Sequence, residues 1–191
     1  MKWNDHSKIL GSHTFLGASK NGWLNDDAEK LKGRYIRFLA VQKGTELHET
    51  AAKLIKQGIE VKDLPLTFNQ YVNDAIGFRM RPEQPLYYSD NCFGTADAIA
   101  WDEKIKFLRI HDLKTGEVPA KMEQLYIYAA LFCLEYGMDP HSLDMELRIY
   151  QLDDIQICAP EVIDILQIMK KIHDFDLVMT ELKKEEEDSW M

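Results

Sequence analysis

The sequence predicts an α/β fold, in which a small mixed sheet is flanked by helices and preceded by a mainly helical N-terminal part. Apolar residues recur at three- and four-residue steps in residues 34–57 and 161–184, which is the helical period. Short apolar segments separated by turn residues, at 84–89, 93–101 and 106–114, are typical of a β-meander. Two further candidate strands, at 143–152 and 155–158, follow a helix expected over 119–136.

The bulk composition is that of a globular protein. The 191 residues are 46% apolar and 29% charged, and the three cysteines lack the close spacing of a metal or iron–sulfur site. We expect one domain over residues 1–191, with a mainly helical part in 1–80, the sheet in 83–158 and a C-terminal helix in 160–188. No signal-peptide pattern and no apolar run of about 18 residues is present, so a cytoplasmic protein with reduced thiols is expected.

The N-terminal part is predicted to begin with a loop over residues 1–18. Ser19 is a suitable N-cap for a helix over residues 20–32, which Gly33 is expected to end.

The long helix over residues 34–57 should end at Gly58 and carries a single apolar stripe. The members of that stripe are Phe38, Val41, Thr45, His48, Ala52 and Ile55. His48 is therefore expected to point inward. A second helix is predicted over residues 66–79, and Pro119 suits the first turn of the later helix.

Two aspartates are expected to face each other within the sheet. Side chains alternate between the two faces of a strand, so Asp97 shares a face with Ile99, and Asp112 shares one with Ile110. If the two strands pair through a turn at residues 102–104, both carboxylates lie at the end away from that turn. Carboxylates at such a distance repel each other unless a cation lies between them, and Mg²⁺ prefers oxygen ligands of this kind.

Other polar groups are predicted to gather beside these aspartates. Lys114 should emerge on the same face as Asp112, where an ammonium group can orient a water or stabilise charge on a phosphate. Gln124 and Tyr128 lie four residues apart on one helix face, from which they could bind a substrate or brace Lys114. His48 would add a nitrogen ligand, which favours Mn²⁺ without excluding Mg²⁺. The combination suits hydrolysis of a phosphodiester.

The order of these residues resembles the PD-(D/E)xK nuclease superfamily, specifically its RecB-like and lambda-exonuclease-like branch. That pattern consists of a helix histidine, Gly-x-x-Asp, Asp-x-Lys and Gln-x-x-x-Tyr. The matching residues are His48, Gly94 with Asp97, Asp112 with Lys114, and Gln124 with Tyr128. The segment from Leu16 to Trp23 is also similar to the serine-containing N-terminal segment of such proteins. Ala96 replaces the proline of the superfamily name, as is common in this branch.

The resemblance implies a restriction-endonuclease-like core and a DNA nuclease that depends on Mg²⁺ or Mn²⁺. An exonuclease of recombination or repair, encoded by a phage and acting in the bacterial or infected cell, is the expected form. The implied metal ligands are His48, Asp97, Asp112 and the backbone carbonyl of Leu113. The implied catalytic residues are Asp97, Asp112, Lys114, Gln124, Tyr128 and Glu83. The cysteines of the iron–sulfur members are absent, so no iron–sulfur cluster is expected.

DNA is the implied partner, and a homo-oligomer or a recombination or replication protein is a further expected partner. Ser19, Arg34, Arg79 and Arg81 are candidates for contact with the substrate, because basic side chains near them could bind phosphates. Solvated helix ends explain the same basic residues equally well.

Other interpretations of these residues stay open at the level of sequence. Asp112 and Lys114 are also compatible with an exposed ion pair, and His48 with a core histidine. The net charge of −9 argues against a non-specific DNA-binding protein. A nuclease-like module that binds nucleic acid or protein without cleavage is therefore one alternative, and a hydrolase of a small phosphorylated substrate is another.

Overall fold

The computed structural model describes residues 5, 7–9 and 14–189, so part of the loop predicted over residues 1–18 lies outside the described residues. The chain divides into two units, Met1–Glu46 and Leu47–Met191. The single domain expected from the sequence stays a prediction. Among the described residues, no helix combines the length and the apolar content needed to cross a membrane.

The first unit contains two short 3₁₀-helices and the start of a long α-helix. These elements are η1 (Ser7–Ile9), η2 (Asn21–Asn25) and α1 (Ala28–Gln57). The prediction of a helix over residues 20–32 that ends at Gly33 is wrong, because α1 begins at Ala28 and continues through Gly33. One interior glycine costs a helix only about 1 kcal/mol, and the strong helix formers around it offset that cost.

The end of α1 agrees with the sequence. Gly58 adopts a left-handed conformation with a φ of 64°, which terminates the helix as predicted. The apolar stripe is buried only in its last part: Ala52 and Ile55 are buried, whereas Val41 and Thr45 are exposed. The stripe therefore packs as predicted only within the part of α1 that belongs to the second unit.

The second unit is built on a five-stranded mixed sheet with the strand order β1-β2-β3-β4-β5. The strands are β1 (Arg81–Ser89), β2 (Cys92–Asp102), β3 (Phe107–Leu113), β4 (Asp144–Gln151) and β5 (Asp154–Cys158). β3 and β4 are parallel and the other neighbours are antiparallel. The parallel pair requires a crossover, which the helix between β3 and β4 provides. The predicted α/β fold with a mixed sheet is thus confirmed.

The remaining elements are α2 (Thr67–Gly77), α3 (Glu123–Tyr136), η3 (Pro140–Ser142) and α4 (Val162–Ser189). The prediction that Pro119 opens the third helix is wrong, because α3 begins at Glu123. The segment before it is held as a loop by the Gln151 side chain, which accepts a hydrogen bond from the Ala120 N–H at 2.7 Å. A side chain from a distant strand thus decides where this helix starts.

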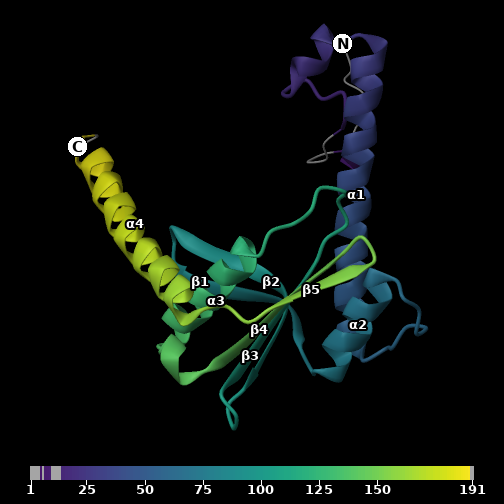
Figure 1. The fold of residues 1–191 in the computed structure, drawn as a ribbon. Coiled ribbons are helices and arrows are strands. Elements are labelled where there is room, and N and C mark those ends of the chain that lie inside the picture. The colour runs from purple at the N-terminus through teal and green to yellow at the C-terminus, as the bar shows by residue number, and fades with distance from the viewer. Residues whose placement is uncertain (1–4, 6, 10–13, 190–191) are drawn as a thin grey trace. The chain divides into compact units, whose positions relative to one another are not determined.

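Each face of the sheet carries its own apolar cluster, and Figure 1 shows α2 on one side and α3 with α4 on the other. Ala98 and Leu113 face α2 and the end of α1, where Ala51 and Val72 are buried. The other face packs against α3 and α4, and its buried members include Ile99, Ile110, Leu125, Ala129 and Ile165. Asp112 lies two residues after Ile110, so strand alternation directs it to the α3 face. The neighbours of Asp97 belong to different clusters, Ala96 to that of the α3 face and Ala98 to that of the α2 face.

Candidate functional site

The pairing of β2 with β3 places the two predicted aspartates opposite each other. Ala98 pairs with His111 in this antiparallel ladder, so the next step of the same register sets Asp97 against Asp112. The predicted hairpin through residues 102–104 is therefore confirmed. Asp97 Oδ2 also accepts a hydrogen bond from the Leu113 N–H at 2.9 Å, which fixes its carboxylate beside β3. The metal-binding role expected of the Leu113 carbonyl stays a prediction.

Glu83 joins Asp97 from the opposite side of β2. Pro82 pairs with Ala98, and Gln84 pairs with Ala96, so the position facing Asp97 belongs to Glu83. Glu83 has a φ of 50°, a left-handed conformation that costs a non-glycine residue on the order of 1 kcal/mol. The pKa of its carboxyl is raised, first by burial and then by the charge of Asp97. Glu83 therefore combines an unfavourable backbone conformation with repulsion from the Asp97 carboxylate.

His48 reaches the same group from α1. Its Nδ1 lies 3.3 Å from Asp97 Oδ2. The contact with Asp97 raises the histidine pKa, burial opposes that shift, and the charges of Asp112 and Glu83 add to it. One ligand atom each from His48, Glu83 and Asp97 lie within 4.8 Å of one another, a spacing that could hold a metal ion. The metal-binding role expected of His48 stays a prediction.

Asp112 has an unusual environment for a charged side chain, because its carboxylate is almost completely buried. The residue is 1% exposed, and both of its carboxylate oxygens are buried. Lys114 Nζ lies 3.0 Å from Oδ2, which makes an ion pair. Burial raises the pKa of Asp112 to about 6, the charge of Asp97 adds to the shift, and Lys114 opposes it. An exposed ion pair is therefore not the explanation of Asp112 and Lys114.

Lys114 is held in place by two side chains of α3. Its Nζ donates to Gln124 Oε1 at 2.8 Å, and Gln124 Nε2 donates to the Tyr128 hydroxyl at 3.0 Å. The predicted helix face thus braces the lysine. Burial raises the pKa of Tyr128, so its hydroxyl stays protonated at neutral pH. The chain of hydrogen bonds leaves the Lys114 ammonium fixed beside Asp112.

Gly94 makes room for this arrangement. A Cβ atom added at Gly94 would lie 2.9 Å from Cε1 of Tyr128, closer than side chains tolerate. The glycine of the Gly-x-x-Asp motif therefore lets the Tyr128 ring lie directly against β2.

We expect Gly94→Ala to displace Tyr128 and to destabilise the fold by about 1–3 kcal/mol. Urea unfolding measures this cost. Gly77→Ala is the matched control, since a Cβ there meets nothing within 4 Å. Combining Gly94→Ala with Tyr128→Ala should cost less than the sum of the two single changes, because the clash is removed. Strict additivity of the two changes would contradict the proposed contact.

The remaining candidates are the four residues expected to contact the substrate. Ser19 and Arg34 belong to the first unit, where Ser19 is exposed and Arg34 Nε contacts Asp26 at 2.9 Å. Arg79 and Arg81 are exposed at the junction of α2 and β1. Contact of these residues with a substrate stays a prediction.

Gln151 supports the site without having been predicted from the sequence. Its buried side chain donates to the carbonyl oxygens of Gly116 and Val118 at 2.6 and 2.8 Å, besides accepting from Ala120. These three bonds fix the loop that joins Lys114 to α3. The sequence shows a glutamine at the end of an apolar strand, but this pattern does not indicate which backbone groups its side chain would bind.

Gln151→Leu should therefore loosen the loop over residues 116–120 while β4 itself survives. Loss of the three hydrogen bonds is expected to lower the free energy of unfolding by about 2–4 kcal/mol, because the backbone groups of the loop are left without partners. Faster amide exchange in this loop, with unchanged exchange in β2, is the measurement. Uniform acceleration across the whole sheet would contradict a local role for Gln151.

Comparison with protein-family models, with curated proteins and with solved structures found no match for this chain.

Proposed function

We propose that this chain is a metal-dependent DNA nuclease with a restriction-endonuclease-like core, and that it acts as an exonuclease in recombination or repair. The observation that carries the proposal is the buried Asp112 carboxylate, whose charge lies beside that of Asp97 and is opposed by the Lys114 ammonium. Lys114 offsets only part of the cost of ionising this buried carboxylate, because the pKa of Asp112 is still raised. The ordered resemblance to PD-(D/E)xK nucleases supports a hydrolytic use of such a cation.

The residues fit a hard divalent cation. His48, Glu83 and Asp97 offer ligand atoms at suitable separation, and Asp112 faces Asp97 from the next strand. Carboxylate oxygens together with one imidazole nitrogen are donors that Mg²⁺ and Mn²⁺ accept. The buried Asp112 carboxylate supplies the second reason, because a cation between Asp112 and Asp97 would offset the repulsion between their charges.

The chain's own residues then have distinct roles in phosphodiester hydrolysis. When bound, the cation would supply Lewis-acid chemistry, lowering the pKa of a water and offsetting charge on the phosphate. His48, Glu83, Asp97 and Asp112 would hold it. Lys114 would donate hydrogen bonds to the attacking water or to a phosphate oxygen, and Gln124 keeps its ammonium in that position.

Digestion of DNA by the purified protein tests the proposal. Linear and circular duplexes and single strands are incubated with Mg²⁺, with Mn²⁺ and with EDTA. Cleavage of linear DNA that needs a divalent cation and spares closed circles is the expected result. Inactivity on all of these substrates with either cation would contradict the proposal.

A second candidate is a nuclease-like module that binds nucleic acid without cutting it. The net charge of −9 favours it, because hydrolysis of long DNA usually relies on a basic surface. Tight binding of DNA in EDTA, without cleavage in Mg²⁺, would select this alternative.

The activity should depend on pH through Asp112. The folded carboxyl has a pKa of about 6, above its ordinary value of 3.8. It is therefore protonated below about pH 6, where a proton competes with the cation. At limiting Mg²⁺ we expect the cleavage rate to rise through about pH 6, and at saturating Mn²⁺ the midpoint should fall. A flat profile across this window at limiting metal would contradict the role of Asp112.

A further inference from the structure

The hairpin of β1 and β2 has one covered face and one bare face. Leu86 and Ala96 are buried in the apolar cluster of the α3 face, and a Cβ atom at Gly94 would meet Tyr128 of α3. On the other side of the sheet, α2 packs mainly against β3 and β4, so it leaves much of the hairpin uncovered. The residues that alternate with the covered ones are exposed on this bare face, namely Pro85, Tyr87, Phe93 and Thr95.

Two aromatic rings lie side by side on the bare face. Tyr87 of β1 pairs with Phe93 of β2 in the strand register. Their rings are nearly parallel, with an angle of 22° between the ring planes and 6.5 Å between the centroids. Tyr87 is 49% exposed and Phe93 is 68% exposed. We refer to these two residues as the aromatic platform, because paired and exposed rings offer a surface on which a flat ligand can stack.

The aromatic platform is held in place by its neighbours. The Tyr87 hydroxyl donates to Asp90 Oδ1 at 2.9 Å, and the Tyr87 N–H donates to Glu135 Oε2 at 2.9 Å. At the tip of the hairpin, the Ser89 hydroxyl donates to Asp176 of α4. A ligand would therefore meet rings that are already ordered, and little free energy would be lost in ordering them.

The outer edge of β1 is protected against a further strand. The Tyr87 N–H points away from β2 and is bound by Glu135. Alternate residues of a strand direct their N–H groups the same way, and Pro85, two residues earlier, has no N–H to offer. A second copy or another protein that adds a strand here would find these donors missing. An occupant of the bare face therefore has to use the rings rather than the edge.

The charges around the aromatic platform are acidic. Asp90 and Glu135 both bind Tyr87, and the whole chain has a net charge of −9. A nucleic acid cannot therefore be held here mainly through its phosphates. A nucleobase, in contrast, has an uncharged π-face that stacks on aromatic side chains. Bases within a duplex already stack on their neighbours, so an unpaired base is the part of a nucleic acid that fits this surface.

The aromatic platform lies on the same two strands as two candidate metal ligands. Phe93 is four residues before Asp97 on β2, and Tyr87 is four residues after Glu83 on β1. Four residues of a strand span roughly 13 Å. A single DNA strand with one phosphate at the cation would reach the rings within about four nucleotides, at about 3.4 Å per stacked nucleotide.

We propose that the aromatic platform stacks unpaired bases of the DNA substrate, a few nucleotides away from the phosphate at the candidate metal site. This inference rests on the proposed nuclease function and narrows its substrate to DNA with a single-stranded segment. Stacking does not depend on the identity of the base, so the platform would bind single strands of any sequence.

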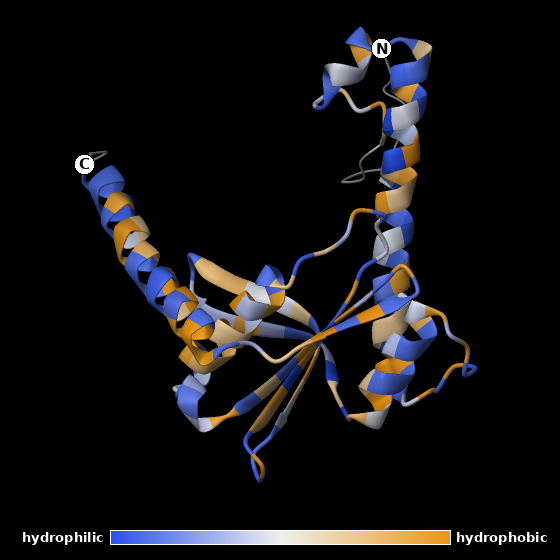
Figure 2. Cartoon of the chain, in the orientation of Figure 1, coloured by the Kyte–Doolittle hydropathy of each residue, from blue (hydrophilic) through white to orange (hydrophobic). Residues whose placement is uncertain are grey.

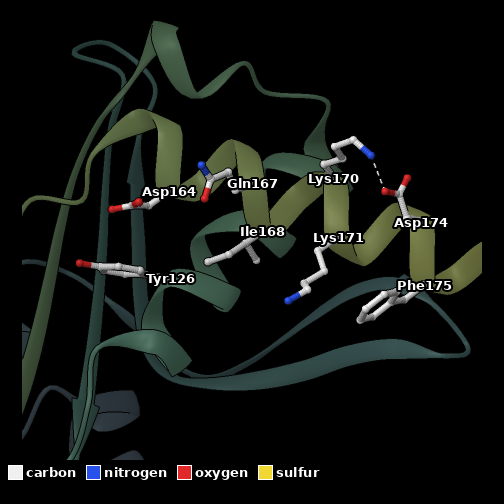
Figure 3. A pocket seen from close by; sticks show the side chains of 8 residues that line it. All are labelled: Tyr126, Asp164, Gln167, Ile168, Lys170, Lys171, Asp174 and Phe175. Carbon is white, nitrogen blue, oxygen red and sulfur yellow. Dashed lines mark hydrogen bonds and ion pairs between the residues drawn. The ribbon is translucent and has the colours of Figure 1, made fainter.

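Phe175 of α4 provides a control ring outside the aromatic platform. Figure 2 shows that hydrophobic residues recur along α4, and Phe175 is 60% exposed. Figure 3 shows it among the side chains that line a hollow between α4 and Tyr126 of α3. The Lys171 ammonium lies 5.7 Å from the centroid of its ring. Phe175 thus matches Phe93 in type and in exposure, but it belongs to a different surface.

Fluorescence anisotropy of a labelled single-stranded oligonucleotide of about 12 nucleotides, in EDTA, tests binding separately from cleavage. Phe93→Ala should weaken the binding at least about tenfold, whereas Phe93→Trp should retain it. Phe175→Ala should leave it unchanged within about twofold. An abasic oligonucleotide of the same length has the phosphates without the bases, so the unaltered protein and Phe93→Ala should bind it equally. Raising the salt from about 50 to 200 mM should weaken binding by less than about threefold, the effect of one phosphate contact.

The outcomes separate this inference from the proposed nuclease function, and circular dichroism verifies that each variant is folded. Binding in EDTA that Phe93→Ala weakens, without any cleavage in Mg²⁺, would contradict the nuclease and still support the aromatic platform. Cleavage of single-stranded DNA with equal binding by the unaltered protein and Phe93→Ala would overturn the platform alone. Equal losses in Phe93→Ala and Phe175→Ala would also overturn it, as would self-association that depends on Phe93 without any binding of the oligonucleotide.

Discussion

Lys114→Met should lower the rate of DNA cleavage by a factor of about 100 or more, while the protein keeps its fold and its affinity for metal. The reason is the position of the ammonium group, which lies 3.0 Å from Asp112 and is held by Gln124. Methionine preserves much of the side-chain volume but donates no hydrogen bond. The transition-state charge on the phosphate would then lack its nearest fixed donor.

The matched control is Lys104→Met, on the turn between β2 and β3. Lys104 is exposed and lies at the end of the hairpin remote from Asp97 and Asp112. Its loss should leave the cleavage rate within about twofold, because a surface charge at this distance is largely screened. Cleavage by Lys114→Met at the rate of the unaltered protein would refute the role assigned to Lys114.

Asp112→Asn should remove the stabilisation of the protein by divalent metal. In the unaltered protein, a cation at 100 times its dissociation constant contributes about 2.7 kcal/mol, which raises Tm by roughly 5–10 °C for a chain of this size. The amide has the shape of the carboxylate but no charge for the cation. Without metal at pH 8, Asp112→Asn should be at least as stable as the unaltered protein, because no buried carboxylate has to be ionised.

The higher stability expected of Asp112→Asn without metal follows from the raised pKa of Asp112. Asp112 titrates at about 6 in the folded protein and near its ordinary value of 3.8 when unfolded. The unfolded chain loses this proton first, so the group lowers the stability as the pH rises through this window. Thermal melts with EDTA and with Mn²⁺ measure both effects, and Asp144→Asn, at an exposed position of β4, is the control. An equal Mn²⁺ shift in Asp112→Asn would show that Asp112 does not bind the cation.

The part of the site that was predictable depends on local periodicity. Strand alternation and the turn at residues 102–104 together set Asp97 against Asp112, and the ladder has that register. The helical period likewise placed Gln124 and Tyr128 together, and their side chains bond to each other. These contacts join residues that are close in the sequence, so the local pattern of residues is enough to predict them.

Non-local contacts account for what was missed. The left-handed backbone of Glu83 is a conformation that a glutamate does not favour, so nothing in its own sequence signals it. Gln151 binds a loop that precedes it by some 30 residues, and those partners meet only after β4 has joined β3. The burial of Asp112 has a similar origin, because α3 packs against the face of the sheet that Asp112 shares with Ile110.

Diffraction from crystals soaked in Mn²⁺ is the most direct test of the central claim, which is that the paired carboxylates of β2 and β3 hold a divalent cation. Anomalous scattering locates the ion independently of its ligands. We predict one strong peak within bonding distance of Asp97 and Asp112, with His48 or Glu83 completing the ligands. Saturated crystals with no peak at these carboxylates, and with Asp112 still paired only with Lys114, would contradict the account.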